Sequence, residues 1–146
     1  HMERDMLKLE NIQIVDCVSD WQEAVRVSVT PLVKEGYVES RYIDGIIQNT
    51  LEMGPYYIIA DGVALLHGRP EQGVIHRQLG VTVLRKETDF GGENAKVKLL
   101  MVLAAEDSNS HIDVMRDLAE IFMDEKKIKK IISAESKEEI LNQFYS

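Results

Sequence analysis

His67 stands where a short apolar run gives way to a polar loop, and Gly68 and Arg69 follow it directly. A neutral imidazole is a nucleophile near physiological pH, because its unperturbed pKa is about 6.5. The guanidinium two residues on offers a planar fork for phosphate oxygens. The glycine removes a side chain beside the imidazole and lets another stretch of backbone approach. These residue types predict a nucleophile next to an anion-binding group.

His111 follows the polar run Ser108, Asn109 and Ser110 and precedes an apolar-periodic segment, so we expect it in the first turn of a helix. Unpaired N–H groups and a partial positive charge at a helix start favour an anion held beside it. The pair His67 and His111 therefore predicts a phosphate site. Their spacing in the chain does not by itself bring the two rings together.

Other chemistries have weaker support. We expect no metal site, because the histidines form no short-spaced pair and have no thiolate companions. His76 lies in a polar loop and is expected to be solvent-exposed. Cys17 follows an apolar run with no basic neighbour, which favours a buried structural thiol. No Gly-x-Ser-x-Gly elbow and no Walker loop are present, so a hydrolase and an ATPase lack support.

Composition bounds the class of protein. The 146 residues, 45% of them hydrophobic, suit one domain with its own core. The net charge of -8 argues against nucleic acid as a direct partner. No apolar stretch is long enough for a membrane span, and no signal peptide is evident, so we expect a cytoplasmic protein. His1 and Met2 resemble an expression-tag remnant, which leaves residues 3–146 as the domain.

Hydrophobic periodicity and turn residues predict the elements that position these side chains. Asp61 and Gly62 form a hairpin signature, and the run at residues 97–105 suits a strand covered on both faces. Strands with helices before and after them predict an α/β layered domain around a central sheet. The expected strands are residues 56–60, 63–66, 80–84 and 97–105, and the expected helices are residues 20–36, 40–51, 110–122, 128–132 and 137–144.

Residues 54–74 read GPYYIIADGVALLHGRPEQGV, a block that resembles the mannitol/fructose-type enzyme IIA domains of bacterial sugar phosphotransferase systems. The ascorbate-specific branch is the most similar, with its pattern Gly-Pro-Tyr-Tyr, then Gly-Ile-Ala-Met-Pro-His-Ala-Arg-Pro-Glu, then Gly-Val. The resemblance spans nearly the whole chain. The further matching stretches are residues 20–24, Pro31 and Leu32 with Gly36, and residues 109–111.

The resemblance implies a single three-layer domain with a central mixed β-sheet flanked by helices. It implies that His67 is the phosphoryl acceptor and that His111 stabilises the phosphate and the transition state. Arg69 and Gly68 would lie at the rim of the site, where the phosphate group and the partner proteins bind. Three residues depart from the pattern, and the arginine that the family often has in the preceding helix is missing around Gln48 and Asn49. The three departures are Asp61, Leu66 and Gly68.

By the same resemblance, phosphorylated HPr would donate its phosphoryl group to His67, and enzyme IIB would accept it. Ascorbate or a related carbohydrate is the expected sugar, with contact to the membrane only through the IIC permease. No cofactor is required, because His111 and nearby N–H groups would neutralise the charge on the oxygens. The alternatives are a phosphorylation-sensing module of a transcription regulator and, with less support, a catalytically silent interaction domain.

Overall fold

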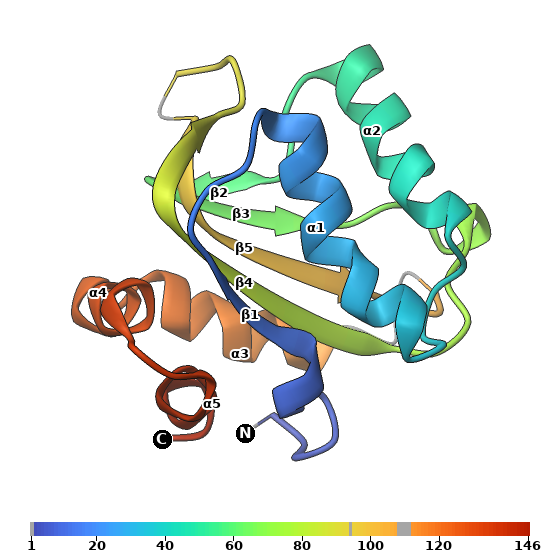
Figure 1. Cartoon of the computed structure of the whole chain (residues 1–146). Coiled ribbons are helices and arrows are strands. Elements are labelled where there is room, and N and C mark those ends of the chain that lie inside the picture. Colours follow the sequence, from blue (N-terminus) through green and yellow to red (C-terminus); the bar gives the residue numbers. More distant parts are fainter. Residues whose placement is uncertain (1, 94, 108–111) are drawn as a thin grey trace.

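The computed structural model describes residues 2–93, 95–107 and 112–146. Its centre is a five-stranded mixed sheet with the strand order β1-β4-β5-β3-β2 (Figure 1). The β2–β3 and β4–β5 pairs are antiparallel, and the β1–β4 and β3–β5 pairs are parallel. The strands are β1 (Ile12–Val15), β2 (Ile58–Ala60), β3 (Val63–Leu66), β4 (Gln78–Asp89) and β5 (Lys96–Ala104).

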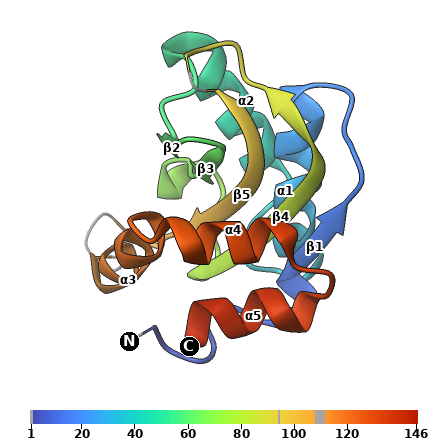
Figure 2. The ribbon, with the colours of Figure 1, turned by 90° about the vertical axis from the view of Figure 1, so that its left-hand side faces the viewer.

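Helices cover both faces of this sheet, and the two ribbon views agree on their sides (Figures 1 and 2). Two helices lie on one face and three on the other, each set with its own buried apolar cluster. The predicted three-layer α/β fold with a mixed sheet is therefore confirmed. The first face carries α1 (Trp21–Lys34) and α2 (Arg41–Met53), and the second carries α3 (Ile112–Phe122), α4 (Glu125–Ser133) and α5 (Lys137–Tyr145).

Short polar residues and a glycine mark three of the helix ends. The Asp20 carboxylate accepts a hydrogen bond from the Glu23 N–H at the start of α1, and the Ser136 hydroxyl accepts one from the Glu139 N–H at the start of α5. The Glu139 carboxylate accepts from the Glu135 N–H rather than from the Ser136 N–H, so a full capping box does not form there. Gly54, with φ of 77°, ends α2.

β5 is the central strand, and its side chains alternate between the two cores. Leu99, Met101 and Leu103 face the α3–α5 side, whereas Leu100 and Val102 face the α1–α2 side. This burial on both faces confirms the prediction made from its continuous apolar run.

The parallel pair β3–β5 brings together two chain ends that the sequence leaves far apart. Leu66 lies opposite Val102 in the register, and both arrowheads point to the same side of the sheet in Figure 1. His67 and Ala105, which follow these strands, therefore leave the sheet at the same edge. A site shared by the segments after β3 and β5 requires this arrangement.

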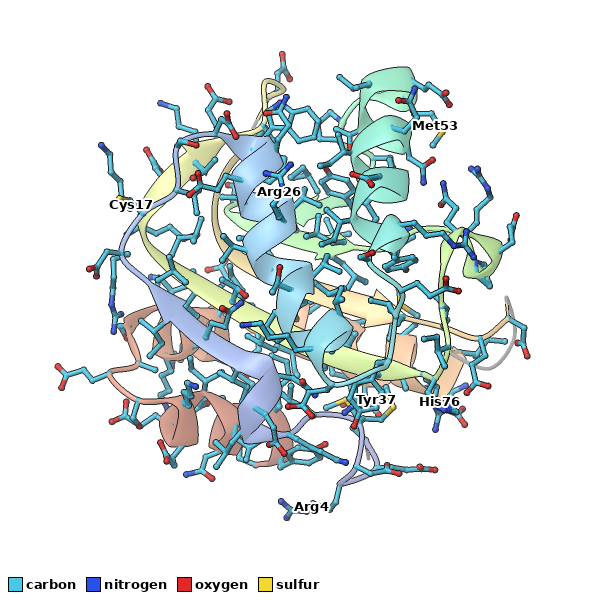
Figure 3. All side chains as sticks on the ribbon, turned by 45° about the vertical axis from the view of Figure 1, so that its right-hand side comes forward. Arg4, Cys17, Arg26, Tyr37, Met53 and His76 are labelled. Atoms are coloured by element: carbon cyan, nitrogen blue, oxygen red, sulfur yellow. The ribbon has the colours of Figure 1, made fainter. Side chains whose placement is uncertain are left out.

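Three expectations, about β1, β4 and Cys17, were incomplete or wrong. β1 was not expected as a strand, and β4 continues to Asp89 rather than ending at residue 84. Cys17 is exposed, so the buried interpretation of this thiol was wrong (Figure 3). The apolar run was a poor guide because β1 ends at Val15. Of the three residues that follow in this run, only Val18 packs against the core.

We expect Leu100→Ala to lower the free energy of unfolding by about 2–5 kcal/mol, because the side chain is fully buried in the central strand. The matched control is Leu51→Ala, since Leu51 is 64% exposed on α2 and should change stability by no more than about 0.5 kcal/mol. Urea denaturation followed by circular dichroism measures both. Equal losses in the two variants would contradict the assignment of β5 to the core.

Candidate functional site

His67 is the first residue after β3, and its imidazole is exposed to solvent. Nδ1 lies 2.7 Å from the carbonyl oxygen of Leu65, two residues earlier. A carbonyl oxygen can only accept, so Nδ1 must carry the proton in this contact. The neutral ring then keeps its lone pair on Nε2, the nitrogen that nucleophilic chemistry requires.

Tyr56 orients His67 from the side. The two rings meet edge to face, with centroids 5.2 Å apart and an interplanar angle of 87°. The Tyr56 hydroxyl also donates a hydrogen bond to the carbonyl oxygen of His67. Burial raises the pKa of this hydroxyl, although Asn49 and Arg69 act in the opposite direction, so the group remains a donor at neutral pH. Ring and backbone of His67 are thus held by one aromatic residue.

The two N–H groups after His67 point into the protein. Gly68 N–H donates to the Tyr42 hydroxyl at 2.8 Å, and Arg69 N–H donates to Oε1 of Gln72 at 2.7 Å. These donors are already engaged, so the expectation that nearby N–H groups neutralise phosphate charge is not supported for these two. A phosphate group at this site would therefore need partners other than these two N–H groups.

Gly68 faces side chains of α2 and of the short 3-10 turn η2 (Pro70–Gln72), not another stretch of backbone. A Cβ at this position would lie 2.9 Å from Oε1 of Gln72 and 3.1 Å from Cε1 of Tyr42. Glycine is therefore needed for close packing beneath the loop. The expected space beside the imidazole is a secondary effect.

A pocket of about 250 Å³ opens beside His67 at the edge where β3 and β5 end. Ala105 and Asp107 line it before the segment 108–111, and Met115 lines it after that segment. His111 lies outside the described residues, so its predicted approach to His67 stays a prediction. The other lining residues are Leu65, His67, Gly68, Arg69, Pro70 and Leu103.

Arg69 lies at the rim of this pocket, with 58% of its side chain exposed. Its Nε is 3.4 Å from a carboxylate oxygen of Glu71, which is itself 72% exposed. An ion pair this accessible to water is weak and is readily exchanged for another anion. The guanidinium is thus available to an incoming phosphate group.

Tyr42, Tyr56 and Gln72 were not identified as site residues from the sequence. Tyr42 looked like one more apolar residue of an amphipathic helix, while Tyr56 and Gln72 lay inside the block around His67 without an assigned role. Around Gln48 and Asn49, where no arginine was found, the Asn49 side chain pairs with Gln72. Only the packing of α2 against the loop reveals these contacts.

His76 is exposed on the loop before β4, as expected (Figure 3). Within residues 2–93, 95–107 and 112–146, no group of three or more His, Cys, Asp or Glu residues could hold a metal ion. In those same ranges no helix has the length and apolar character to cross a membrane.

The chain belongs to the family described as "Phosphoenolpyruvate-dependent sugar phosphotransferase system, EIIA 2", which matches residues 5–146. It is an enzyme IIA component of a sugar phosphotransferase system and therefore a phosphotransferase. These comparisons lend no support to the alternative of a transcription regulator module.

Two relatives illustrate the range of the family. The mannitol-specific cryptic phosphotransferase enzyme IIA component of Escherichia coli K12 is 34% identical over 136 residues, 93% of this chain and 92% of the relative. A solution structure of the mannitol-specific cryptic phosphotransferase enzyme IIA from Escherichia coli is 33% identical to this chain. Its TM-score is 0.89, and the match covers 96% of this chain and 95% of that one. The ascorbate-specific EIIA component of Salmonella choleraesuis is 35% identical over 142 residues, 95% of this chain and 92% of the relative.

One solved neighbour is a complex of enzyme IIAMTL with phosphorylated enzyme IIBMTL from Escherichia coli. It is 27% identical to this chain, with a TM-score of 0.82, and covers 95% of this chain and 96% of that one. The fold described above is thus the fold of a IIA domain that has been seen bound to its IIB partner.

The anchor beneath the loop gives a pH-dependent prediction. Burial raises the pKa of Tyr42 to about 12, although the Gly68 hydrogen bond lowers it, whereas the unfolded residue titrates near 10. The fold favours the neutral phenol, so this contribution to stability is complete below pH 10 and is lost as the pH rises toward 12. The free energy of unfolding should fall less steeply over that interval in Tyr42→Phe than in the unmodified chain. Parallel curves would show that Tyr42 does not titrate as a buried group.

Proposed function

We propose that Nε2 of His67 accepts a phosphoryl group from phosphorylated HPr and passes it to enzyme IIB. The observation that carries this proposal is the contact between Nδ1 and the Leu65 carbonyl oxygen, because it leaves Nε2 unprotonated on an exposed ring. The pocket beside the ring provides room for a phosphoryl group, and Arg69 provides a cation at its rim.

The transfer step needs no group beyond the two proteins. The Nε2 lone pair forms a bond to phosphorus while the bond between phosphorus and the donor atom of HPr breaks, and that electron pair stays with HPr. The ring of His67 then carries a positive charge, which the Leu65 carbonyl oxygen stabilises through Nδ1–H. Transfer to IIB is the same displacement in the opposite direction, with a IIB atom as the nucleophile.

Charge on the phosphoryl oxygens is met by side chains in this proposal. Arg69 can exchange its exposed contact with Glu71 for a phosphoryl oxygen. His111 belongs to the segment flanked by the pocket residues Asp107 and Met115, which supports a role for it in stabilising the transition state. Gly68 is proposed to act through packing and partner contact at the same rim.

The partners follow from the same activity. A neighbouring IIA structure contains phosphorylated IIB, which supports IIB as the acceptor for this chain. We propose HPr as the donor, a cytoplasmic location, and contact with the membrane only through the IIC permease. The relatives carry the names of mannitol and ascorbate, and the block around His67 favours ascorbate or a related carbohydrate.

We predict that His67→Ala abolishes phosphorylation without unfolding the chain, because the exposed ring contributes little to the core. The purified protein is incubated with phosphoenolpyruvate, enzyme I and HPr, and intact-mass analysis detects an acid-labile phosphoryl group. His76→Ala is the matched control, since His76 is an exposed histidine one loop away and should leave labelling unchanged. Labelling of the His67→Ala protein would rule out His67 as the acceptor.

His111→Ala should slow transfer by about a hundredfold or more, the scale that is lost with one electrostatic donor in a transition state. Rapid-quench measurement of transfer from HPr and to IIB gives both rates. Unchanged rates would remove His111 from the site, and a phosphoryl group found on residue 111 would reverse the roles of the two histidines.

A further inference from the structure

We propose that Gln72 is the positioning residue of the His67 loop, defined as residues 67–69, and that Asn49 of α2 holds Gln72 in place. This inference rests on the proposed phosphoryl transfer at His67. Gln72 does not itself line the pocket, but it bonds the backbone of the lining residue Arg69, so it acts through the backbone that carries His67 and Arg69.

The first observation is a closed set of hydrogen bonds around the Gln72 amide. Oε1 accepts from Arg69 N–H at 2.7 Å and from Asn49 Nδ2 at 2.9 Å. Nε2 donates to Asn49 Oδ1 at 3.0 Å, with the Gly45 carbonyl oxygen at 3.5 Å beyond it. Because Arg69 N–H can only donate, it fixes which end of the Gln72 amide faces the loop, and this in turn fixes the orientation of Asn49.

The second observation is that two glycines make room for this side chain. A Cβ at Gly45 would lie 3.1 Å from Cβ, Cδ and Nε2 of Gln72, and a Cβ at Gly68 would lie 2.9 Å from its Oε1. Gly45 lies inside α2, where alanine would stabilise an isolated helix better. Its presence there is explained by the close approach of Gln72.

The third observation is that these contacts come from one face of α2. Tyr42, Gly45 and Asn49 follow each other at spacings of three and four residues, so they share one face of the helix. Through this face α2 holds Gly68 N–H by Tyr42 and Arg69 N–H by way of Gln72. Asn49 is only 3% exposed, so its amide pair with Gln72 is shielded from competing water.

The backbone of Arg69 is thereby fixed on both sides. Its N–H donates to the Gln72 side chain, and its carbonyl oxygen accepts from the Gln72 N–H at 2.9 Å. Pro70 further restricts the residue before it to extended conformations, and Arg69 has φ of -73° and ψ of 147°. Arg69 also lines the pocket beside His67. Gln72 thus fixes the backbone from which the guanidinium of Arg69 and, two residues earlier, the imidazole of His67 extend.

The test compares Gln72→Met, which keeps an unbranched side chain of similar length but removes both ends of the amide, with Gln48→Met. Gln48 lies on α2 next to Asn49 in the sequence, but its side chain is exposed and donates a hydrogen bond to the Glu52 carboxylate. With enzyme IIB in excess as the final acceptor, steady-state transfer from phosphorylated HPr through each protein gives kcat and KM separately. We expect kcat to fall by tenfold to a hundredfold in Gln72→Met with KM within about threefold, and no change in Gln48→Met.

Nitrogen-15 NMR of the imidazole supplies a readout that a loss of stability alone would not change. The unmodified protein should show His67 as the Nδ1–H tautomer, and folded Gln72→Met should show a mixture of tautomers because the loop no longer holds the ring against Leu65. Asn49→Leu should reproduce the kinetic loss. The loss in the double variant should be smaller than the two single losses combined, since the two amides bond each other.

If Gln72→Met fails to fold, Gly45→Ala decides the question. The added methyl group favours the helix but presses on Gln72, so we expect a folded protein with a reduced kcat. Transfer by folded Gln72→Met, or by Gly45→Ala where the first does not fold, at the rate of Gln48→Met would overturn the positioning role. An unmodified protein that accepts no phosphoryl group would instead overturn the proposed function itself.

Discussion

The parallel pairing of β3 with β5 is the constraint on which the site depends. β5 is buried on both faces, so a slip of one residue would exchange the side chains of its two cores. The register that places Leu66 beside Val102 is therefore held by the apolar packing of both cores, which involves many more side chains than the contacts within the loop. Because the strands run in the same direction, the segments after them emerge at one edge, and the pocket beside His67 forms there.

A second constraint acts on the backbone that follows β3. Side chains of Tyr56, Tyr42 and Gln72 satisfy one backbone polar group each at His67, Gly68 and Arg69. A loop whose polar groups are satisfied by a packed helix has few alternative conformations, so the exposed imidazole rests on a rigid support. The same contacts remove two N–H donors from the reach of a phosphate. An anion beside His67 would therefore meet the Arg69 side chain at the rim rather than these two amides.

Local signals were reliable guides where one residue type meets one physical requirement. Asp20 and Gly54 marked helix ends because a cap needs a short acceptor or a residue that tolerates positive φ. The apolar run of β5 predicted that this strand is buried on both faces. Cys17 and β1 were misjudged because apolar character within a short run does not reveal which residue leaves the sheet first. The polar end of β4 was missed because its pairing with β5, not its own composition, keeps it extended.

The sequence by itself determined the fold class, the family and the histidine at the end of a strand, because these depend on periodicity, turn residues and a block of matching residues. Only the tertiary structure decided which groups surround that histidine. The partner of Nδ1 comes from the local turn, but the hydroxyl of Tyr42 and the amides of Asn49 and Gln72 reach the loop only after α2 packs beside it. Hydrogen bonds between segments so distant in the chain form only when a helix packs against the sheet. No local pattern of residues encodes that packing.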